Sequence, residues 1–553
     1  MDEAESRSDS CLSAEEDAPV VGNHAEHCSG NQTFQALLSE DTEETELQGT
    51  AVHAMDASTN TEPKRRCCGW LRKRCPCPPR GLMASLITKA SMAAVLFGVV
   101  WSITEDECLP GGNLFGIVTL FICSLIGGKL MGLVHLPRLP PLPPLLGMLL
   151  AGVLLRNIPV VTKAVYIHFR WSASLRNIAL AVILTRAGLG LDASALKKLK
   201  AVCVRVAIVP CLVEASTVAL LSHFLMDFPW IWGFILGFVL GAVSPAVVVP
   251  SMLLLQKDGY GTEQGVPTLL MAAGSFDDVI AITGFTTCLG IAFATGSTWF
   301  NILRGLLEVL GGIVAGVALG FFLQFFPSKD QVQIPNYTDQ KAVVLKRSFL
   351  LLGLGVFAVF SSNVAGFPGS GGLCTLVLAL LAGIGWKENK APVEEVVGKV
   401  WDVFQPLLFG LIGAEIRISA LEPITVALGL ATLSIALSVR IFITFLMVLC
   451  AGFNFKEKIF IALAWMPKAT VQAAIGSTAL DMARVKQDEK FQRFGMDVLS
   501  VAVLSILITA PVGALLIGLC GPRLLRRPKN PEWAVSQGTL SPSDAQVAYE
   551  SAI

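Results

Sequence analysis

The sequence predicts an all-helical, polytopic membrane protein with about fourteen transmembrane helices. Three observations carry this prediction. Of the 553 residues, 53% are hydrophobic and 15% are charged, whereas a soluble protein carries about 25% charged residues. Apolar runs long enough to cross a bilayer, which takes about 20 residues, recur from residue 82 to residue 520. Two of these runs are interrupted by proline at matched positions, which indicates an internal repeat.

The first part of the chain is expected to lie outside the membrane. Residues 1–63 are acidic, polar and poor in aromatic residues, which is typical of a disordered tail. The basic run 64–80 is expected to contact anionic lipid at the cytoplasmic face. Four cysteines of this run are expected to be palmitoylated, because their spacing suits a zinc site poorly: Cys67, Cys68, Cys75 and Cys77.

Fourteen apolar segments follow, each identified from its run of apolar residues. Their expected limits are 82–102, 111–134, 141–156, 173–192, 199–224, 230–255, 265–292, 298–325, 346–365, 368–386, 401–418, 421–451, 458–481 and 495–520. The amphipathic stretch 393–404 is expected to form an interfacial helix that leads into the eleventh segment.

Positive charge sets the expected orientation. The basic runs 64–80 and 523–529 flank the first and last segments, so both termini are expected in the cytoplasm, which requires an even number of spans. The sequons at Asn31 and Asn336 then fall on the cytoplasmic side, and we expect neither to be glycosylated. The sequence leaves open whether the host membrane is plasma, endolysosomal or mitochondrial.

Two pairs of similar stretches indicate an inverted repeat. AGLGLDAS (187–194) resembles IGAEIRIS (412–419), and SPAVVVP (244–250) corresponds to MPKATVQ (466–472). Members of each pair lie seven spans apart, which inverts the second copy in the membrane, as in secondary transporters. The expected organisation is a tail with its basic segment (1–80), an extra helix (81–110), a first repeat (111–292), a linker helix and loop (293–345), a second repeat (346–520) and a C-terminal tail (521–553).

Adjacent acids mark the expected functional site. Asp277 and Asp278 lie midway along the apolar run 265–292, where each charge costs roughly 2.5–3.5 kcal/mol by insertion scales. Intramembrane acids usually line ion or proton pathways, although structural salt bridges within a bundle are the alternative. The side chains of consecutive helical residues point about 100° apart, so one acid could face a cavity and the other a neighbouring helix.

Proline interrupts two spans near these acids. Pro245 and Pro467 remove a helical hydrogen bond, and two such breaks are expected to cross near the midplane and present free carbonyls. Ordinary proline kinks are the alternative. Hard cations such as Na⁺ take oxygen ligands. Besides the two carboxylates, the candidate oxygens are the Ser244 hydroxyl and the carbonyls at Val243 and Gly274.

Three more charges fall inside apolar segments. Glu214 and Arg440 occupy the fourth span of each repeat, so we predict a salt bridge between them, with a structural role, because removing one partner would strand a buried charge. Lys468 follows the second proline break. It is expected to neutralise the carbonyl end of a half-helix and to approach an aspartate.

Together, GAVSPAVVVP, GSFDDVIAIT and AWMPKATVQAAI resemble the monovalent cation:proton antiporter superfamily, and within it the NHA branch of animal sodium/hydrogen exchangers, akin to NhaA-type bacterial antiporters. The resemblance covers about 111–520. It implies an NhaA-like fold, a homodimer with a dimer domain and a mobile core domain, and elevator-like exchange of Na⁺ or Li⁺ for H⁺ at Asp277 and Asp278. Bacterial relatives have a lysine at the position that Arg440 occupies here, so this sequence departs from the bacterial pattern at that residue.

The implied mechanism is competition between cation and proton for the same oxygens. Arginine cannot release a proton, which favours electroneutral exchange. The alternatives are a K⁺/H⁺ antiporter, a Na⁺-coupled symporter of an organic anion, and a channel, although no filter-like repeat is visible. No motif for an enzyme's nucleophile, metal or cofactor is present, and no basic, aromatic-rich patch suits nucleic acid.

Overall fold

The computed structural model describes residues 82–134, 142–190, 200–262, 264–294, 298–327, 337–386 and 390–526. The chain divides into two compact units, Met1–Arg80 and Gly81–Ile553, and all described residues belong to the second. Several predictions therefore lie outside the described residues. They concern the two tails, the run 64–80, the sequons at Asn31 and Asn336, and the candidate palmitoylation sites Cys67, Cys68, Cys75 and Cys77.

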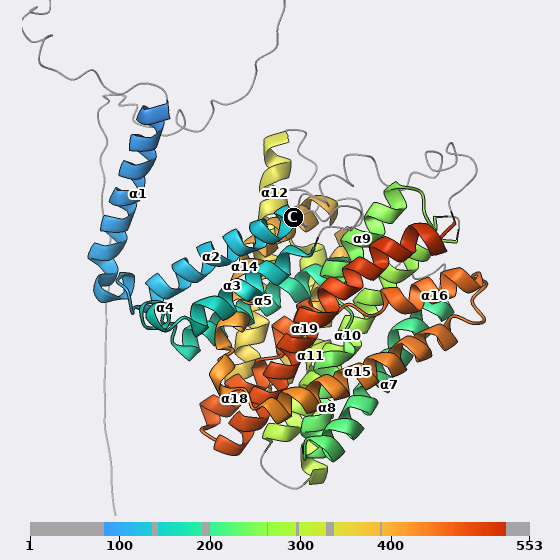
Figure 1. Ribbon diagram of the computed structural model, residues 1–553. Coiled ribbons are helices and arrows are strands. Elements are labelled where there is room, and N and C mark those ends of the chain that lie inside the picture. The colour runs from blue at the N-terminus through green and yellow to red at the C-terminus, as the bar shows by residue number, and fades with distance from the viewer. Residues whose placement is uncertain are drawn as a thin grey trace, which may run out of the picture. The chain divides into compact units, whose positions relative to one another are not determined.

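The described part of the chain is entirely helical and contains no strand (Figure 1). Its elements are α1 (Leu82–Thr104), η2 (Glu105–Cys108), α2 (Asn113–Leu133), α3 (Pro144–Asn157), α4 (Pro159–Ala164), α5 (Phe169–Gly190), α7 (Lys200–Leu225), α8 (Trp230–Gly241), α9 (Pro245–Lys257), α10 (Val266–Phe293), α11 (Thr298–Phe325), α12 (Tyr337–Val364), α13 (Pro368–Trp386), α14 (Lys390–Glu415), η5 (Ile418–Ala420), α15 (Pro423–Met447), α16 (Phe455–Ala464), α17 (Thr470–Ile475), α18 (Thr478–Lys486) and α19 (Glu489–Leu524).

Among the described residues, ten helical segments are long and apolar enough to cross a membrane, and two apolar helices are shorter. The all-helical, multi-pass prediction is therefore confirmed, while the count of fourteen stays a prediction. The stretch 393–404 is helical and runs without a break into the eleventh segment as part of α14, while its location at a membrane interface stays a prediction. Val393, Val397 and Trp401 are buried along it, so packing against neighbouring helices extends the helix.

The helices of the second unit form two groups by their mutual packing. We call α7–α10 and α15–α19 the core bundle, and α2, α3, α5 and α11–α14 the panel. Glycine permits close approach within the core bundle: a Cβ added at Gly237 on α8 would lie 2.3 Å from the Ala215 carbonyl oxygen on α7. Small residues that let helix backbones meet are typical of packing in membranes.

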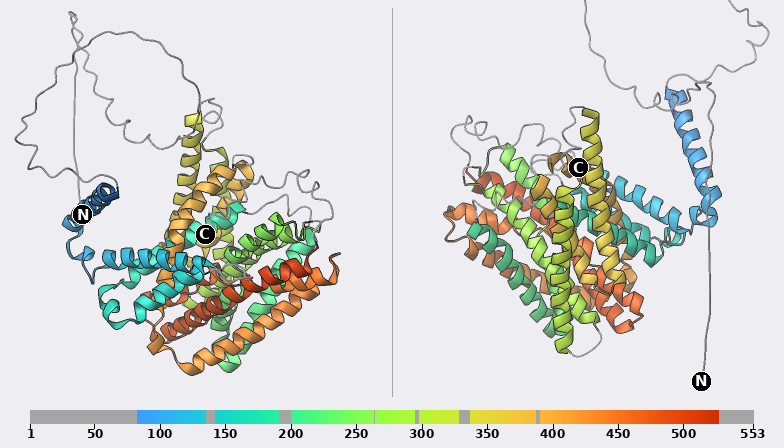
Figure 2. Two further views of the ribbon diagram at one scale, coloured as in Figure 1. Left: turned by 45° about the horizontal axis from the view of Figure 1, so that its top comes forward. Right: turned by 180° about the vertical axis from the view of Figure 1, so that it is seen from behind.

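Glycine contacts also hold the panel together, where α2, α3 and α14 meet. A Cβ at Gly147 on α3 would lie 2.0 Å from the Gly127 carbonyl oxygen on α2, and one at Gly413 on α14 would lie 2.2 Å from the Leu149 carbonyl oxygen on α3. Figure 2 shows α2 and α3 (blue to teal) running side by side. In contrast, the most apolar window of α1 has no buried residue, so the apolar side chains of α1 face the surroundings of the unit.

Candidate functional site

Two interrupted helices meet in the middle of the core bundle. Helix α8 ends at Gly241 and α9 begins at Pro245, whose missing N–H suits the first position of a helix. Helix α16 ends at Ala464 and α17 begins at Thr470, with Pro467 between them. The two breaks touch: the Ser244 N–H donates to the Pro467 carbonyl over 2.8 Å, and the Ser244 and Thr470 hydroxyl oxygens lie 3.4 Å apart.

Asp277 on α10 is fully engaged at this crossing. Its Oδ2 accepts a hydrogen bond from the Val243 N–H over 2.7 Å. Its two carboxylate oxygens also accept bonds from Arg440 Nη2 over 3.1 and 2.9 Å. The side chains of Asp277 and Arg440 are both 0% exposed. This carboxylate therefore holds the unwound segment of α8–α9 against α10 and α15.

Glu214 on α7 pairs with two cations. Its Oε2 accepts a hydrogen bond from Arg440 Nη1, so the salt bridge predicted between Glu214 and Arg440 is present. Its Oε1 lies 2.8 Å from Lys468 Nζ. Lys468 therefore meets a glutamate, whereas the sequence suggested an aspartate. We call Asp277, Glu214, Arg440 and Lys468 the central network.

The central network also satisfies backbone groups at the helix breaks. Arg440 donates to the carbonyls of Gly241 and Trp465, the latter over 3.2 Å, and Lys468 Nζ donates to the Leu240 carbonyl. The last carbonyls of a helix have no partner within the helix, and cations complement the negative end of the helix dipole. The expectation that Lys468 serves half-helix carbonyls agrees with this geometry, and Arg440 does the same.

Asp278 differs from its neighbour. It is 4% exposed, and its buried Oδ1 has no hydrogen-bond partner. One turn earlier, Gly274 is buried, yet a Cβ added there would meet no atom within 4 Å. A buried carboxylate oxygen without a hydrogen-bond partner is costly, and binding of a cation or a proton would remove that cost. The two acids therefore face different surroundings, as their 100° separation allows.

Sequence reasoning missed one polar side chain at the crossing of the broken helices, Gln472. Gln472 on α17 is 0% exposed, and its Nε2 donates to the carbonyls of Val239 over 3.0 Å and Ala242 over 2.9 Å. The amide thereby fixes the end of α8 and the segment that precedes Val243. Its position five residues after Pro467, inside a mostly apolar span, was the available signal.

A second group of charges, also missed, joins the core bundle to the panel. We call Arg176, Glu415, Asp481 and Arg484 the end cluster. Arg176 on α5 donates to both carboxylate oxygens of Asp481 on α18 over 2.8 Å and to Glu415 on α14 over 3.1 Å. Arg484 Nη2 donates to Glu415 over 2.9 Å. Charged residues inside the apolar stretches RWSASLRNIAL and IGAEIRIS were the signal that could have found it.

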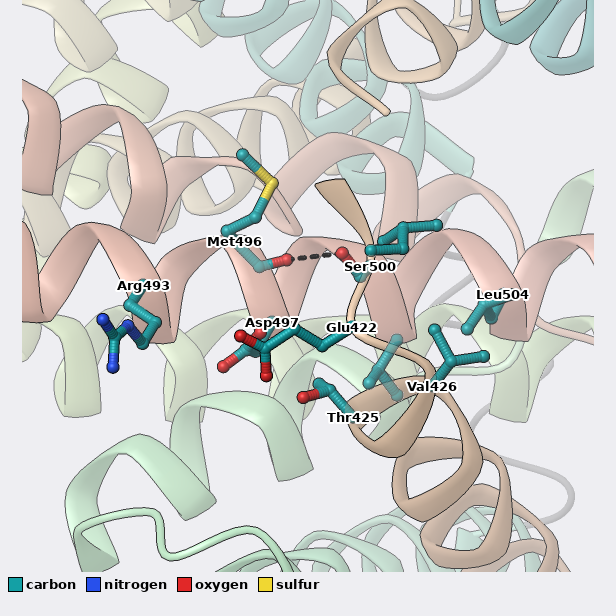
Figure 3. A pocket seen from close by; sticks show the side chains of 10 residues that line it. Glu422, Thr425, Val426, Arg493, Met496, Asp497, Ser500 and Leu504 are labelled. Atoms are coloured by element: carbon teal, nitrogen blue, oxygen red, sulfur yellow. Dashed lines mark hydrogen bonds between the residues drawn. The ribbon is translucent and has the colours of Figure 1, made fainter. Parts of the chain in front are cut away.

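A pocket lies elsewhere, between the beginning of α15 and the first turns of α19 (Figure 3). The carboxylates of Glu422 and Asp497 lie side by side there, with Thr425 and Ser500 near them. None of the residues predicted to bind the ion lines this pocket. The candidate site therefore stays at the crossing of the broken helices.

Comparison with known proteins identifies the family of the chain. The family model described as "Sodium/hydrogen exchanger, transmembrane" matches residues 117–520. The human "Sodium/hydrogen exchanger 9B2" is 66% identical over 457 residues, which cover 83% of each chain. The human "Sodium/hydrogen exchanger 9B1" is 54% identical over 455 residues, covering 82% of this chain and 86% of the relative.

Among solved structures, the sodium proton antiporter MjNhaP1 from Methanocaldococcus jannaschii has a similar fold. Its TM-score is 0.57 at 18% identity, with 74% of this chain and 99% of that chain covered. At this identity the likeness concerns the fold alone. The family model and the two relatives cover most of the chain, and together they establish that the chain is a multi-pass membrane protein of the sodium/hydrogen exchanger family.

Proposed function

We propose that this protein exchanges Na⁺ or Li⁺ for H⁺ across a membrane, with cation and proton competing for the site formed by Asp277 and Asp278. The observation that carries the proposal is the buried, unpaired Oδ1 of Asp278 beside the open space at Gly274. Asp277 supports the site by holding the segment 242–244 in place through Val243. The Ser244 hydroxyl and the backbone carbonyls of that segment are further candidate ligands.

Charge counting supports an electroneutral cycle. The central network contains two carboxylates, Asp277 and Glu214, and two cations, Arg440 and Lys468, all 0% exposed, so it is balanced. Asp278 adds one negative charge that nothing in the network offsets. One Na⁺ or one proton restores neutrality. A buried uncompensated charge is costly. The core bundle can therefore move past the panel when the site holds Na⁺ or a proton, whereas it cannot move when the site is empty and charged.

The proposed movement is an elevator-like displacement of the core bundle against the panel, with the panel forming the contact in a homodimer. The packing of the helices into these two groups supports this division. The alternation of access would arise from the inverted repeats 111–292 and 346–520. We propose α1 as the extra helix that precedes them, both termini in the cytoplasm, and anionic lipid at the run 64–80 as a membrane contact.

The test is the internal pH of proteoliposomes that contain the full-length protein, after NaCl, LiCl or KCl is added outside. Wild type should alkalinise the lumen when Na⁺ or Li⁺ is added outside, because inward cation movement is exchanged for outward H⁺, whereas Asp278→Asn should be at least about a hundredfold slower. The Asn variant keeps the size of the side chain but loses the charge. Exchange by Asp278→Asn at the wild-type rate would remove Asp278 from the mechanism.

The same vesicles separate the alternatives. A response to K⁺ that equals the response to Na⁺ would favour a K⁺/H⁺ antiporter. No proton movement with any cation would favour a Na⁺-coupled symporter of an organic anion. Electroneutral exchange should leave a membrane-potential dye unchanged during Na⁺ addition, whereas a potential that builds up with transport would contradict one-for-one exchange.

A further inference from the structure

An arginine of the panel is buried without a counter-charge among the described residues. Arg347 lies in the third turn of α12 and is 6% exposed. It lies at the end of the panel where α11 and α13 finish and where α12 and α14 begin. The other deeply buried arginines, Arg176 and Arg440, each form ion pairs with two carboxylates. Arg347 is therefore an exception within the described part of the chain.

The contacts of Arg347 leave one buried donor, its Nε, without an acceptor. Its guanidinium carbon lies 5.3 Å from the centre of the Trp386 ring on α13. That ring is fixed by the hydrogen bond from its Nε1 to the Leu323 carbonyl on α11, 3.0 Å long. The buried Nε of Arg347 has no partner, and we find no ion pair of this side chain among the described residues. The aromatic ring holds the guanidinium but supplies no hydrogen-bond acceptor.

A second cation lies against the same helix end. The side chain of Lys390, on α14, passes over Gly383: its Cε is 3.5 Å from the position of a Cβ there. Gly383 and Trp386 are three residues apart on α13 and so share a face. Lys390 Nζ pairs with Glu394 over 3.1 Å. The last turn of α13 is thus flanked by two cations and one carboxylate.

We propose that Arg347, with Lys390 beside it, binds a phosphate group. Arginine stays charged at all physiological pH values, so a buried guanidinium calls for an anion rather than for deprotonation. Its planar fork matches the oxygens of phosphate in bidentate fashion. The phosphate can belong to an anionic phospholipid or be free. Exposed Phe325 and Phe349, on α11 and α12, offer apolar surface for acyl chains at this end of the panel.

The experiment uses full-length protein in detergent and follows its melting temperature. The probes are phosphatidylglycerol against phosphatidylcholine, and inorganic phosphate against chloride at equal ionic strength. Wild type should gain stability from at least one phosphate probe. Arg347→Gln should raise the half-saturating concentration at least about tenfold, the loss expected for a hydrogen bond to a charged group. Lys346→Gln removes the same charge from the exposed neighbouring position and should change it less than about twofold.

The outcomes separate the ligand sources and the rival explanation. Stabilisation by phosphatidylglycerol alone identifies a lipid headgroup, and saturation by inorganic phosphate identifies a free anion. Equal losses in the two variants, or no stabilisation of wild type by either probe, would overturn the proposal. Arg347 could instead only complement the carbonyl end of α13; Arg347→Gln would then melt lower while its gain from the probes stayed at the wild-type value.

A variant that keeps the charge covers the case in which Arg347→Gln does not fold. Arg347→Lys retains a cation but loses the planar fork. Native mass spectrometry of this variant should show less retained phosphatidylglycerol than wild type, and retention at the wild-type level would contradict the bidentate site. These measurements report binding rather than transport, so their result is independent of the proposed exchange activity.

Discussion

The central network and the end cluster use the same residue types in different settings. The central network is 0% exposed and lies entirely within the core bundle. The end cluster has side chains that are 2 to 22% exposed, and it connects α5 and α14 of the panel to α18 of the core bundle. Buried ion pairs are weak evidence for stability alone. The central network connects helices within the core bundle. The end cluster connects the core bundle to the panel, and these contacts must break when the two groups move in the proposed cycle.

The largest expected effect comes from breaking the central network. Arg440→Met removes the partner of two buried carboxylates, and loss of one member of a buried pair costs about 3–5 kcal/mol. Because a whole domain is stable by only about 5–15 kcal/mol, the variant should melt far below wild type. Arg484→Met in the end cluster is the matched control and should melt close to wild type. Equal drops in melting temperature would abolish the distinction between the two sets.

Gln472→Leu should produce the next largest effect. The variant leaves the Val239 and Ala242 carbonyls without their amide donor, at a cost of about 1–3 kcal/mol for each buried group left unpaired. We expect a lower melting temperature and a weaker apparent affinity for Na⁺, because the segment before Val243 loses its support. Gln256→Leu on α9 is the control, since the buried Oε1 of Gln256 has no partner to lose. If both variants behave alike, Gln472 does not position the segment.

Asp481→Asn should act mainly on the rate of exchange. It removes one charge of the end cluster while keeping the shape of the side chain, and Arg176 keeps its ion pair with Glu415. If the cluster holds the core bundle against the panel, turnover in proteoliposomes should rise up to about fivefold, with the half-saturating Na⁺ concentration unchanged. A shift in that concentration with no change in turnover would instead assign the cluster to ion binding.

Gly274→Ala, which should have the smallest effect on stability, tests whether the open space near Asp278 takes part in ion binding. Gly274→Ala and Gly311→Ala each place a methyl group where no atom lies within 4 Å, and each should stabilise its helix by about 1 kcal/mol or less. Only Gly274→Ala narrows the space beside Asp278, so only it should raise the half-saturating Na⁺ concentration. Unchanged Na⁺ dependence in Gly274→Ala would show that this space takes no part in binding.

The sequence predicted the helical class and the residues that gather at the crossing, because apolar length and proline act locally. Pro245 and Pro467 lie at the observed breaks, and the pairing of Glu214 with Arg440 followed from the cost of unpaired charge. The sequence could not separate the roles of Asp277 and Asp278, since which acid faces Arg440 depends on how α10 is rotated against α15. It marked charges of the end cluster inside apolar stretches but could not show that they pair, because α5, α14 and α18 meet only in three dimensions.

The amphipathic stretch 393–404 shows a second limit of sequence-based prediction. Its amphipathic pattern is compatible with a membrane surface, yet the polar face is balanced by local pairs such as Lys399 with Glu395, 2.8 Å apart. Val393 and Val397 are buried against residues of α5, α11, α12 and α13, and the stretch forms one helix with the rest of α14. Periodicity alone does not say which surface covers an apolar face.

The wide sequence separation within the central network has a consequence for biosynthesis. Glu214 precedes Arg440 by 226 residues and Lys468 by 254, and Asp277 precedes Arg440 by 163. A ribosome that adds about 5–20 residues per second therefore delivers the acids several seconds or more before their cations. During that interval the nascent α7 and α10 hold carboxylates whose partners do not yet exist. The first half of the chain thus enters the membrane with carboxylates that become paired only after the second half has been synthesised.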